Sequence, residues 1–275
     1  MNIAGRVLII AGSDSGGGAG IQADIKAVSA LGGFATTAVT ALTAQNTVGV
    51  HGVHPVPPAF IRQQMDVVLD DLGADCIKTG MLHDAEVVRT VAEGLAERAP
   101  GVPLVVDPVM VSQTGARLLE DTAMQALMQL LFPRATLITP NLPEAETLLG
   151  APIPDAEAML DAARALQRMT GGSVLLKGGH LDGDDLFDVL QHPGGCRVFR
   201  QERIPTRHTH GTGCTLASAI SAGLAQGLSL EQAVIRGRNY LLKALASAPA
   251  LGRGDGPVNH VHTVDGDAVG ALQDG

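Results

Sequence analysis

Residues 210–215, with the sequence His-Gly-Thr-Gly-Cys-Thr, combine residue types that suit the transfer of a phosphoryl group. They open a predicted helix, where unpaired backbone amides and the helix dipole favour an anion. Gly211 and Gly213, on either side of Thr212, would let a phosphate approach the backbone closely. The segment therefore predicts an oxyanion cradle. A simple helix cap explains Gly211 to Gly213 equally well.

Cys214 lies at or near the first turn of the same helix. A helix N-terminus lowers the pKa of a thiol and makes the thiolate available as a base or nucleophile. Free cysteines are more often inert residues of the core, so both roles stay open. Cys76 and Cys196 are far away and form no C-x-x-C pair with it, which predicts neither a disulfide framework nor a zinc site and fits a reducing cytoplasm.

A glycine-rich segment, residues 12–20, stands between a predicted strand and a predicted helix. It lacks the glycine at position 21 that would complete G-x-G-x-x-G from Gly16, and the chain has no G-x-x-x-x-G-K-[ST] P-loop. So many glycines beside Asp14 and Asp24 indicate close approach to a ligand. A flexible tight turn is the alternative.

Asp107, Asn141 and Glu144 offer oxygen ligands at the ends of two predicted strands. Hard cations take carboxylate oxygens and keep several waters, so this set can hold Mg²⁺ on nucleotide phosphates. Asn141 and Glu144 also fit a helix N-cap with a capping box. Lys177 ends an apolar strand at Gly178, so its ammonium group could reach phosphate or extend to solvent.

A mainly parallel sheet must position these residues, because apolar runs of strand length alternate with helix-period segments, as in βαβ units. We predict strands over 6–11, 35–41, 76–79, 104–107, 137–139 and 174–177, and an antiparallel edge pair over 186–190 and 198–204. We predict helices over 21–31, 58–69, 84–97, 143–149, 155–169, 212–226 and 230–248. A loop is expected through Gln45 and Asn46. One domain, residues 1–248, is expected before a loosely ordered tail, residues 249–275.

The chemically interesting residues follow the predicted strands directly. In open α/β sheets, ligands bind beyond the carboxyl ends of the strands. The segments concerned are 12–14, 43–45, 80–81, 107–108, 140–141 and 178–179. Their common position predicts one composite site.

Composition narrows the classes of function. With 45% hydrophobic and 17% charged residues among 275, the chain can bury a full core and does not resemble a disordered one. A net charge of −9 argues against a broad basic surface for nucleic acid. No apolar run approaches the ~20 residues of a membrane span. The histidine pairs 208/210 and 260/262 lack carboxylate or cysteine partners at recognised spacing, so we expect no metal site from them.

Six blocks together resemble the hydroxymethylpyrimidine/phosphomethylpyrimidine kinases of thiamine biosynthesis, within the ribokinase-like superfamily. The blocks are AGSDSGGGAGIQAD (11–24), TALTAQNT (40–47), DPVM (107–110), TPNLPEAE (139–146), KGGH (177–180) and HGTGCT (210–215). The likeness runs from Arg6 to about Ala248. It implies a three-layer α/β/α domain whose mostly parallel central sheet has an antiparallel edge. It also implies an ATP- and Mg²⁺-dependent enzyme, typically a homodimer, that phosphorylates 4-amino-5-hydroxymethyl-2-methylpyrimidine and then its monophosphate.

The resemblance also assigns roles to individual residues. The pyrimidine would be bound by Gln45, which hydrogen-bonds the ring, and by Gly12, Asp24, Met81 and Val109. The anion hole would be Gly211, Thr212, Gly213 and Cys214, with Cys214 as the base. Lys177, Asn141 and Thr212 would contact the nucleotide phosphates, and Asp107 and Glu144 would organise the metal.

Sugar kinases of this superfamily usually have Asp where Cys214 stands, so the cysteine favours a heteroaromatic hydroxymethyl substrate. A pyridoxal or pyridoxine kinase is the near alternative. A Cys-dependent acyl transferase or hydrolase, using Cys214 with His208 or His210, belongs to a different class and leaves Gln45 and Lys177 without a role. A non-catalytic nucleotide-binding module is a third alternative.

Overall fold

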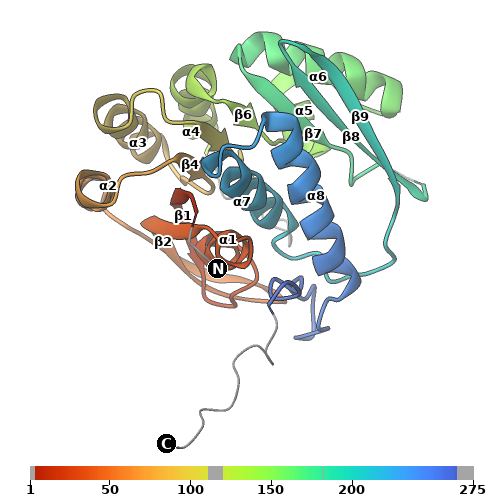
Figure 1. Cartoon of the computed structure of the whole chain (residues 1–275), viewed down its shortest axis with the longest axis horizontal. Coiled ribbons are helices and arrows are strands. Elements are labelled where there is room, and N and C mark those ends of the chain that lie inside the picture. The colour runs from red at the N-terminus through yellow and green to blue at the C-terminus, as the bar shows by residue number, and fades with distance from the viewer. Residues whose placement is uncertain (1–3, 111–119, 182, 265–275) are drawn as a thin grey trace, which may run out of the picture.

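The computed structural model describes residues 4–110, 120–181 and 183–264. Within these residues the strands form a nine-stranded sheet in the order β3-β2-β1-β4-β5-β6-β7-β8-β9 (Figure 1). The strands are β1 (Arg6–Asp14), β2 (Phe34–Asn46), β3 (Gly49–Pro55), β4 (Cys76–Thr79), β5 (Leu104–Val106), β6 (Leu137–Ile138), β7 (Ser173–Lys177), β8 (Asp185–His192) and β9 (Gly195–Glu202). The strands from β2 to β7 are parallel, whereas β3 at one edge and β8 and β9 at the other are antiparallel.

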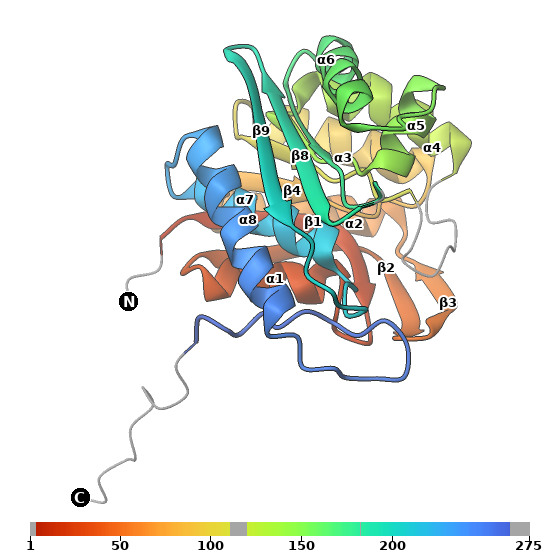
Figure 2. The same ribbon diagram turned by 90° about the vertical axis from the view of Figure 1, so that its right-hand side faces the viewer.

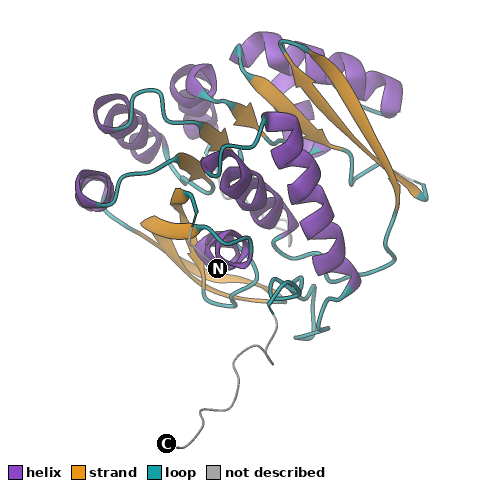
Figure 3. Ribbon diagram, in the orientation of Figure 1, coloured by secondary structure: helices purple, strands orange, loops and turns teal. Residues whose placement is uncertain are grey.

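Helices cover both faces of the sheet (Figure 3). They are α1 (Gly20–Ala30), α2 (Pro58–Asp71), α3 (Ala85–Arg98), α4 (Asp121–Ala126), α5 (Leu142–Leu149), α6 (Ala156–Thr170), α7 (Thr212–Ala225) and α8 (Leu230–Ala246). Successive residues of β1 point to opposite faces: Leu8 belongs to the core cluster that also includes side chains of α2 and α3, and Ile9 belongs to the cluster that includes Val28 of α1 and Ala222 of α7. This arrangement confirms the predicted three-layer α/β/α domain. No helix among the described residues is long and apolar enough to span a bilayer.

The second strand differs from its prediction. A loop was expected through Gln45, but β2 continues to Asn46 and forms an antiparallel hairpin with β3. The β3 sequence, Gly-Val-His-Gly-Val-His-Pro, is largely exposed, so it carries no hydrophobic alternation that would reveal a strand. The predicted antiparallel pair at the other edge is confirmed as β8 and β9. The region before β6 also contains α4, for which we predicted no helix.

The segment that follows α8 is packed against the domain, which differs from the prediction. Residues 249–264 were expected to be loosely ordered, but Val258 and His260 are only 2% and 4% exposed. Asn259 donates its backbone N–H to the Ala244 carbonyl (2.9 Å), and the Tyr240 hydroxyl donates to the His260 carbonyl (2.7 Å). In Figure 2 the segment runs in dark blue away from the end of α8. Its Gly- and Asp-rich composition reflects close backbone contacts rather than disorder. Residues 265–275 lie outside the described part of the chain.

Stability should fall as the pH is lowered through the titration range of His260. Burial, with smaller effects of Lys26 and His262, lowers the pKa of His260 to about 4. An unfolded histidine has a pKa of ~6.5, so between these values the unfolded chain binds more protons and stability is lost as the pH falls. We expect this residue to account for a loss of up to about 3 kcal/mol. Urea unfolding of wild type and His260→Gln at pH 7.5 and 4.5 measures it; equal pH dependence of the two proteins would contradict the prediction.

Candidate active site

A cavity of about 610 Å³ lies beyond the carboxyl ends of the parallel strands. This is the position expected for a ligand site in an open α/β sheet, and the volume suits a small molecule. The predicted site residues that line it are Gly12, Gln45, Met81, Asp107, Val109, Asn141, Glu144, Lys177, Gly211, Thr212, Gly213 and Cys214. Asp24 was also predicted to form the pocket, but it does not line the cavity.

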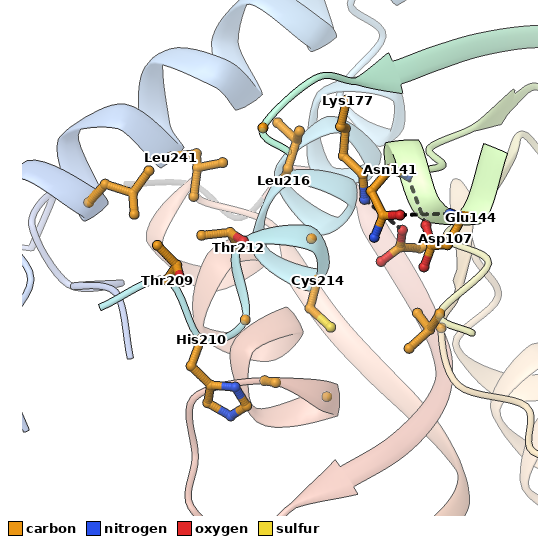
Figure 4. A pocket seen from close by; sticks show the side chains of 18 of the residues that line it. Asp107, Asn141, Glu144, Lys177, Thr209, His210, Thr212, Cys214, Leu216 and Leu241 are labelled. Atoms are coloured by element: carbon orange, nitrogen blue, oxygen red, sulfur yellow. Dashed lines mark hydrogen bonds and ion pairs between the residues drawn. The ribbon is translucent and has the colours of Figure 1, made fainter. Parts of the chain in front are cut away.

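The segment predicted to be an anion cradle lies at the start of α7. Gly211 is the N-cap residue, with a left-handed φ of 82°. A Cβ atom on Gly211 would lie 1.8 Å from the Gly18 carbonyl oxygen, so the backbone of the glycine-rich loop packs directly on this turn. A Cβ atom on Gly213 would lie 3.3 Å from Nζ of Lys177 and 3.4 Å from Oδ2 of Asp107. The bare backbone of this turn thus faces a charged pair (Figure 4).

Cys214 points into the cavity from the first turn of α7 (Figure 4). Burial raises the pKa of its thiol to about 12; Lys78 opposes this change, while Asp24 and Asp107 add to it. The prediction that the helix N-terminus lowers this pKa is therefore wrong. Desolvation and the neighbouring carboxylates outweigh the helix dipole, and the thiol is protonated at neutral pH.

Lys177 and Asp107 form an ion pair at the ends of β7 and β5. Nζ of Lys177 lies 3.2 Å from Oδ1 of Asp107, and the Thr139 hydroxyl donates to the same oxygen at 2.9 Å. Burial alone would lower the pKa of Lys177, but Asp107 and Glu144 outweigh it and raise that pKa. Lys177 is therefore a fixed cation at the cavity wall rather than a side chain extended to solvent.

Asn141 and Glu144 form the capping box that the sequence suggested. The Asn141 side chain accepts from the Glu144 backbone at 2.9 Å, and the Glu144 carboxylate accepts from the Asn141 backbone at 2.8 Å. Glu144 also accepts from the Met110 backbone at 3.3 Å. Burial raises the pKa of Glu144, partly offset by Lys177. Its carboxylate thus fixes the start of α5 and still borders the cavity.

The donor set for a metal ion consists of two carboxylates. Among the described residues, no group of three or more His, Cys, Asp or Glu side chains is placed to hold a metal. Mg²⁺ commonly binds through one or two carboxylates together with phosphate oxygens and water. Thr139 and Lys177 both contact Oδ1 of Asp107, while Oδ2 faces the Gly213 turn. Asp107 and Glu144 therefore fit a magnesium ion that arrives with a nucleotide.

The glycine-rich loop folds around Asp14. The backbone N–H groups of Gly16, Gly18 and Ala19 donate to its carboxylate at 2.8, 3.0 and 2.8 Å. Nε2 of His210 lies 2.8 Å from Oδ2 of the same carboxylate. Burial alone would raise the pKa of Asp14, but His210 and the amides lower it. These three amides thus bind an internal carboxylate and are not free to bind a phosphate. Other parts of the same segment, Gly12, Ser13 and Gly20, line the cavity, which is compatible with the predicted close approach to a ligand.

A buried ion pair that was not predicted from the sequence lies at the floor of the cavity. Nζ of Lys78 lies 3.0 and 2.9 Å from the two carboxylate oxygens of Asp24, and the Ser218 hydroxyl donates to Oδ1 at 2.7 Å. Lys78 lines the cavity, while Asp24 lies behind it. The detectable signal was a lysine inside the apolar strand β4. Asp24 therefore acts on the site through Lys78.

The pyrimidine side of the predicted pocket is formed by β1, β2 and β4. A Cβ atom on Gly12 would lie 2.5 Å from Cε of Met81, so these two residues are in direct contact. The Gln45 backbone is held by Ser15, whose hydroxyl donates to the Gln45 carbonyl at 2.9 Å. Val109 has a φ of 38°, a strained value for a β-branched residue, directly after Pro108. All four predicted residues, Gly12, Gln45, Met81 and Val109, line the cavity.

The cavity is also lined by a group of aliphatic side chains that was not predicted. Ile204, Leu241 and Leu245 line it, and Figure 4 shows Leu241 beyond Thr212. A buried ion pair between Arg238 and Asp188 joins α8 to β8 there. These residues lie outside the six sequence blocks, and ordinary aliphatic residues on a helix give no signal of ligand contact.

This fold and this site together define a ribokinase-like kinase of small molecules. The glycine-bordered turn at the start of α7 faces a fixed lysine, and aliphatic side chains line the same cavity. The chain belongs to the phosphomethylpyrimidine kinase family, because the model of that family matches residues 14–259. The family predicted from the six sequence blocks is thereby confirmed.

Individual relatives agree with this assignment. The chain is 52% identical over 257 residues to the thiamine biosynthesis bifunctional protein ThiED of Geobacter sulfurreducens; the match covers 94% of the chain but only 52% of that relative. The chain thus spans about half the length of the bifunctional protein. It is 46% identical over 254 residues to the hydroxymethylpyrimidine/phosphomethylpyrimidine kinase of Streptomyces coelicolor, covering 92% of the chain and 93% of the relative.

Two solved structures are similar over most of the fold. The pyridoxal kinase from Staphylococcus aureus in complex with AMP-PCP and pyridoxal matches with a TM-score of 0.86 and 33% identity, covering 94% of each chain. The phosphomethylpyrimidine kinase from Clostridium difficile 630 matches with a TM-score of 0.77 and 39% identity, covering 87% of this chain and 98% of the other.

Proposed function

We propose that the chain is an ATP-dependent kinase that phosphorylates the hydroxymethyl group of 4-amino-5-hydroxymethyl-2-methylpyrimidine and then the resulting monophosphate. One observation carries the proposal: a Cβ atom placed on Gly213 at the start of α7 would lie 3.3 Å from Nζ of Lys177 and 3.4 Å from Oδ2 of Asp107. An anion site, a cation and a carboxylate thus meet at one wall of a single cavity. Relatives at 46% identity over nearly their full length are named for both phosphorylations.

The residues take the following roles in this proposal. Gln45, with Gly12, Met81 and Val109, holds the pyrimidine so that its hydroxymethyl oxygen is in line with the γ-phosphorus. That oxygen forms the new O–P bond, the bond to the β-phosphate oxygen breaks, and ADP leaves. The hydroxyl proton passes to Sγ of Cys214 in the fraction of molecules in which this group is a thiolate. Positioning and charge stabilisation supply most of the rate in such a reaction.

The nucleotide would occupy the other side of the cavity. Asn141, Thr212 and Lys177 would contact its phosphates, and the aliphatic side chains of Leu241 and Leu245 suit a flat base. Asp107 and Glu144 would hold Mg²⁺, which neutralises phosphate charge when it is bound. The AMP-PCP complex of a pyridoxal kinase with the same fold supports the use of ATP.

Among the alternatives, pyridoxal kinase is supported by a specific observation: the structure of the Staphylococcus aureus pyridoxal kinase matches this fold with a TM-score of 0.86. The acyl transferase alternative has less support: it needs a histidine to activate Cys214, but His210 is held by Asp14 at 2.8 Å, and burial raises the thiol pKa to about 12.

A purified-enzyme assay with ATP and Mg²⁺ tests the proposal. With hydroxymethylpyrimidine and pyridoxal supplied side by side, we expect kcat/KM to be at least about tenfold higher for the pyrimidine, equivalent to ~1.4 kcal/mol of transition-state stabilisation. Chromatography that resolves the mono- and diphosphate products shows whether both steps occur. A preference for pyridoxal, or ATP binding without turnover of either compound, would overturn the proposal.

We further propose that the enzyme is a homodimer in a reducing cytoplasm. Leu42, Val48, Val53 and Phe60 are exposed apolar side chains on β2, β3, their turn and α2, which supports pairing with a second copy through this region. Light scattering should then give a mass of twice 28.2 kDa for the wild type, and a lower one for Leu42→Asp. A wild-type mass of one chain would contradict the homodimer.

A further inference from the structure

The segment after α8 contacts both sides of the anion hole. We name residues 251–260 the C-terminal strap. The His210 backbone, directly before the anion hole, donates to the Gly256 carbonyl at 3.2 Å, and His210 forms a β-bridge with Pro257. Directly after the anion hole, the Thr215 hydroxyl and Nε2 of His260 share a hydrogen bond of 2.9 Å. The strap therefore brackets residues 211–214 at both ends.

The same strap contacts the turn that follows Gln45. The Gly254 backbone N–H donates to the Thr47 hydroxyl at 3.2 Å. A Cβ atom on Gly252 would lie 2.3 Å from that hydroxyl oxygen, and one on Gly254 would lie 2.0 Å from the Thr47 carbonyl oxygen. Side chains at these two positions would separate the strap from the β2–β3 turn. The glycines are thus required by close approach.

The His260 end of the strap is anchored to the domain independently of the anion hole. Its carbonyl accepts from the Tyr240 hydroxyl of α8 at 2.7 Å, and Thr215 is fully buried beneath it. A buried hydrogen bond between two otherwise fixed elements restricts both partners, and losing one partner leaves the other unsatisfied. The strap can therefore transmit the rigidity of α8 to the start of α7.

We propose that the C-terminal strap positions the two reactants of the phosphoryl transfer relative to each other. Its His260 end holds the anion hole, and its Gly254 end holds the turn beside Gln45, the residue proposed to bind the pyrimidine. In-line transfer requires these two sites to stay aligned, because a misplacement of ~1 Å can cost ~10²-fold in rate. This inference rests on the proposed function and makes His260 a positioning residue, since it does not line the cavity.

The two ends should produce different kinetic effects. His260→Ala and Thr215→Val should each lower kcat about tenfold, with KM for the pyrimidine within about twofold of wild type, because they loosen the anion hole. The kcat of the double variant should be no lower than that of the less active single variant, because the two substitutions remove the same hydrogen bond. Thr215→Ser keeps the hydroxyl, so its kcat should be close to that of the wild type and not to that of Thr215→Val. Additive losses, or no rescue by serine, would overturn the role of this pair.

The Gly254 end should affect KM instead. Gly254→Ala and the milder Thr47→Ala should raise KM for the pyrimidine about tenfold and leave kcat within about twofold, because they release the turn beside Gln45. Thr47→Ala keeps the test valid if Gly254→Ala does not fold. A change in kcat alone would overturn this half of the proposal.

His262 provides a matched control. It lies two residues beyond His260, but its Nε2 is 3.0 Å from the Tyr240 carbonyl, and this bond joins it to α8 rather than to α7. His262→Ala should leave kcat within about twofold of wild type. A loss equal to that of His260→Ala would show a general loss of stability instead of positioning.

Hydrogen–deuterium exchange tests the role of the strap independently of the proposed function, because the measurement needs no substrate. Amides in the 208–216 peptide should exchange about tenfold faster in His260→Ala than in wild type or His262→Ala, reporting local opening. If the wild type does not phosphorylate the pyrimidine, the proposed function is wrong. The exchange measurement still shows whether the strap holds the start of α7 in place. Unchanged exchange in His260→Ala would overturn the inference.

Discussion

Replacing Cys214 with alanine is expected to lower kcat for pyrimidine phosphorylation by about 10² to 10⁴, with KM for both substrates within about threefold of wild type. Cys214 lies at the anion hole, and the proposed task of its thiolate form is to accept the hydroxyl proton during transfer. Removing it leaves the cavity wall and the Lys177–Asp107 pair in place. Steady-state kinetics of Cys214→Ala measure the effect.

The pH dependence of the reaction gives this prediction a second readout. Burial raises the pKa of the Cys214 thiol to about 12, so only a small fraction is thiolate near neutrality. A rate that depends on the thiolate should rise with pH between about 7 and 9, by at most about tenfold per unit, and this rise should be absent in Cys214→Ala.

Cys196 supplies the control for both measurements, because it is an exposed free thiol on β9. Cys196→Ala should match the wild type in kcat and in pH dependence. A near-normal kcat in Cys214→Ala, or the same alkaline rise without the thiol, would eliminate Cys214 as the base.

Gly211→Ala is expected to lower kcat by about 10² to 10³, the range found when one oxyanion-hole donor is lost. Two physical effects combine at this position. The φ of 82° is costly for alanine, and the new Cβ would meet the Gly18 carbonyl oxygen at 1.8 Å. The turn must therefore move away from the glycine-rich loop, which displaces the backbone amides of the anion hole.

A substitution at Gly227 distinguishes the effect of backbone strain from the effect of displacing the turn. Its φ is 81°, nearly that of Gly211, but a Cβ atom there would meet nothing within 4 Å. Gly227→Ala should therefore lose about 1 kcal/mol of stability and keep its kcat. Denaturant unfolding and kinetics of both variants make the comparison. Equal kcat in Gly211→Ala and Gly227→Ala would exclude the anion-hole explanation.

The interior of the sheet could be predicted from the sequence because burial shapes its strands. The predicted strand at 76–79 has the same bounds as β4, since all four of its residues are buried between two layers of helices. The exposed strand β3 escaped prediction because solvent on its surface imposes no apolar pattern. Burial thus determined how much of the fold could be predicted.

The site could be predicted only in part, for a related reason. The residues predicted at strand ends line one cavity, because parallel strands bring their carboxyl ends to one edge. Their partners were not predicted, since pairs such as His210 with Asp14, separated by 196 positions, depend on the order of strands and helices in space. The thiol pKa of Cys214 was mispredicted because the desolvation that dominates it comes from distant segments.

The contacts of Asp14 and Gly18 have a consequence for biosynthesis. The glycine-rich loop is synthesised long before the partners that it packs against, because Asp14 precedes His210 by 196 positions and Gly211 and Pro257 come later still. During translation the early strands can pair while the loop lacks the surface that it finally packs against. We therefore expect nascent chains that stop before about residue 260 to contain much of the sheet and to lack a functional catalytic centre.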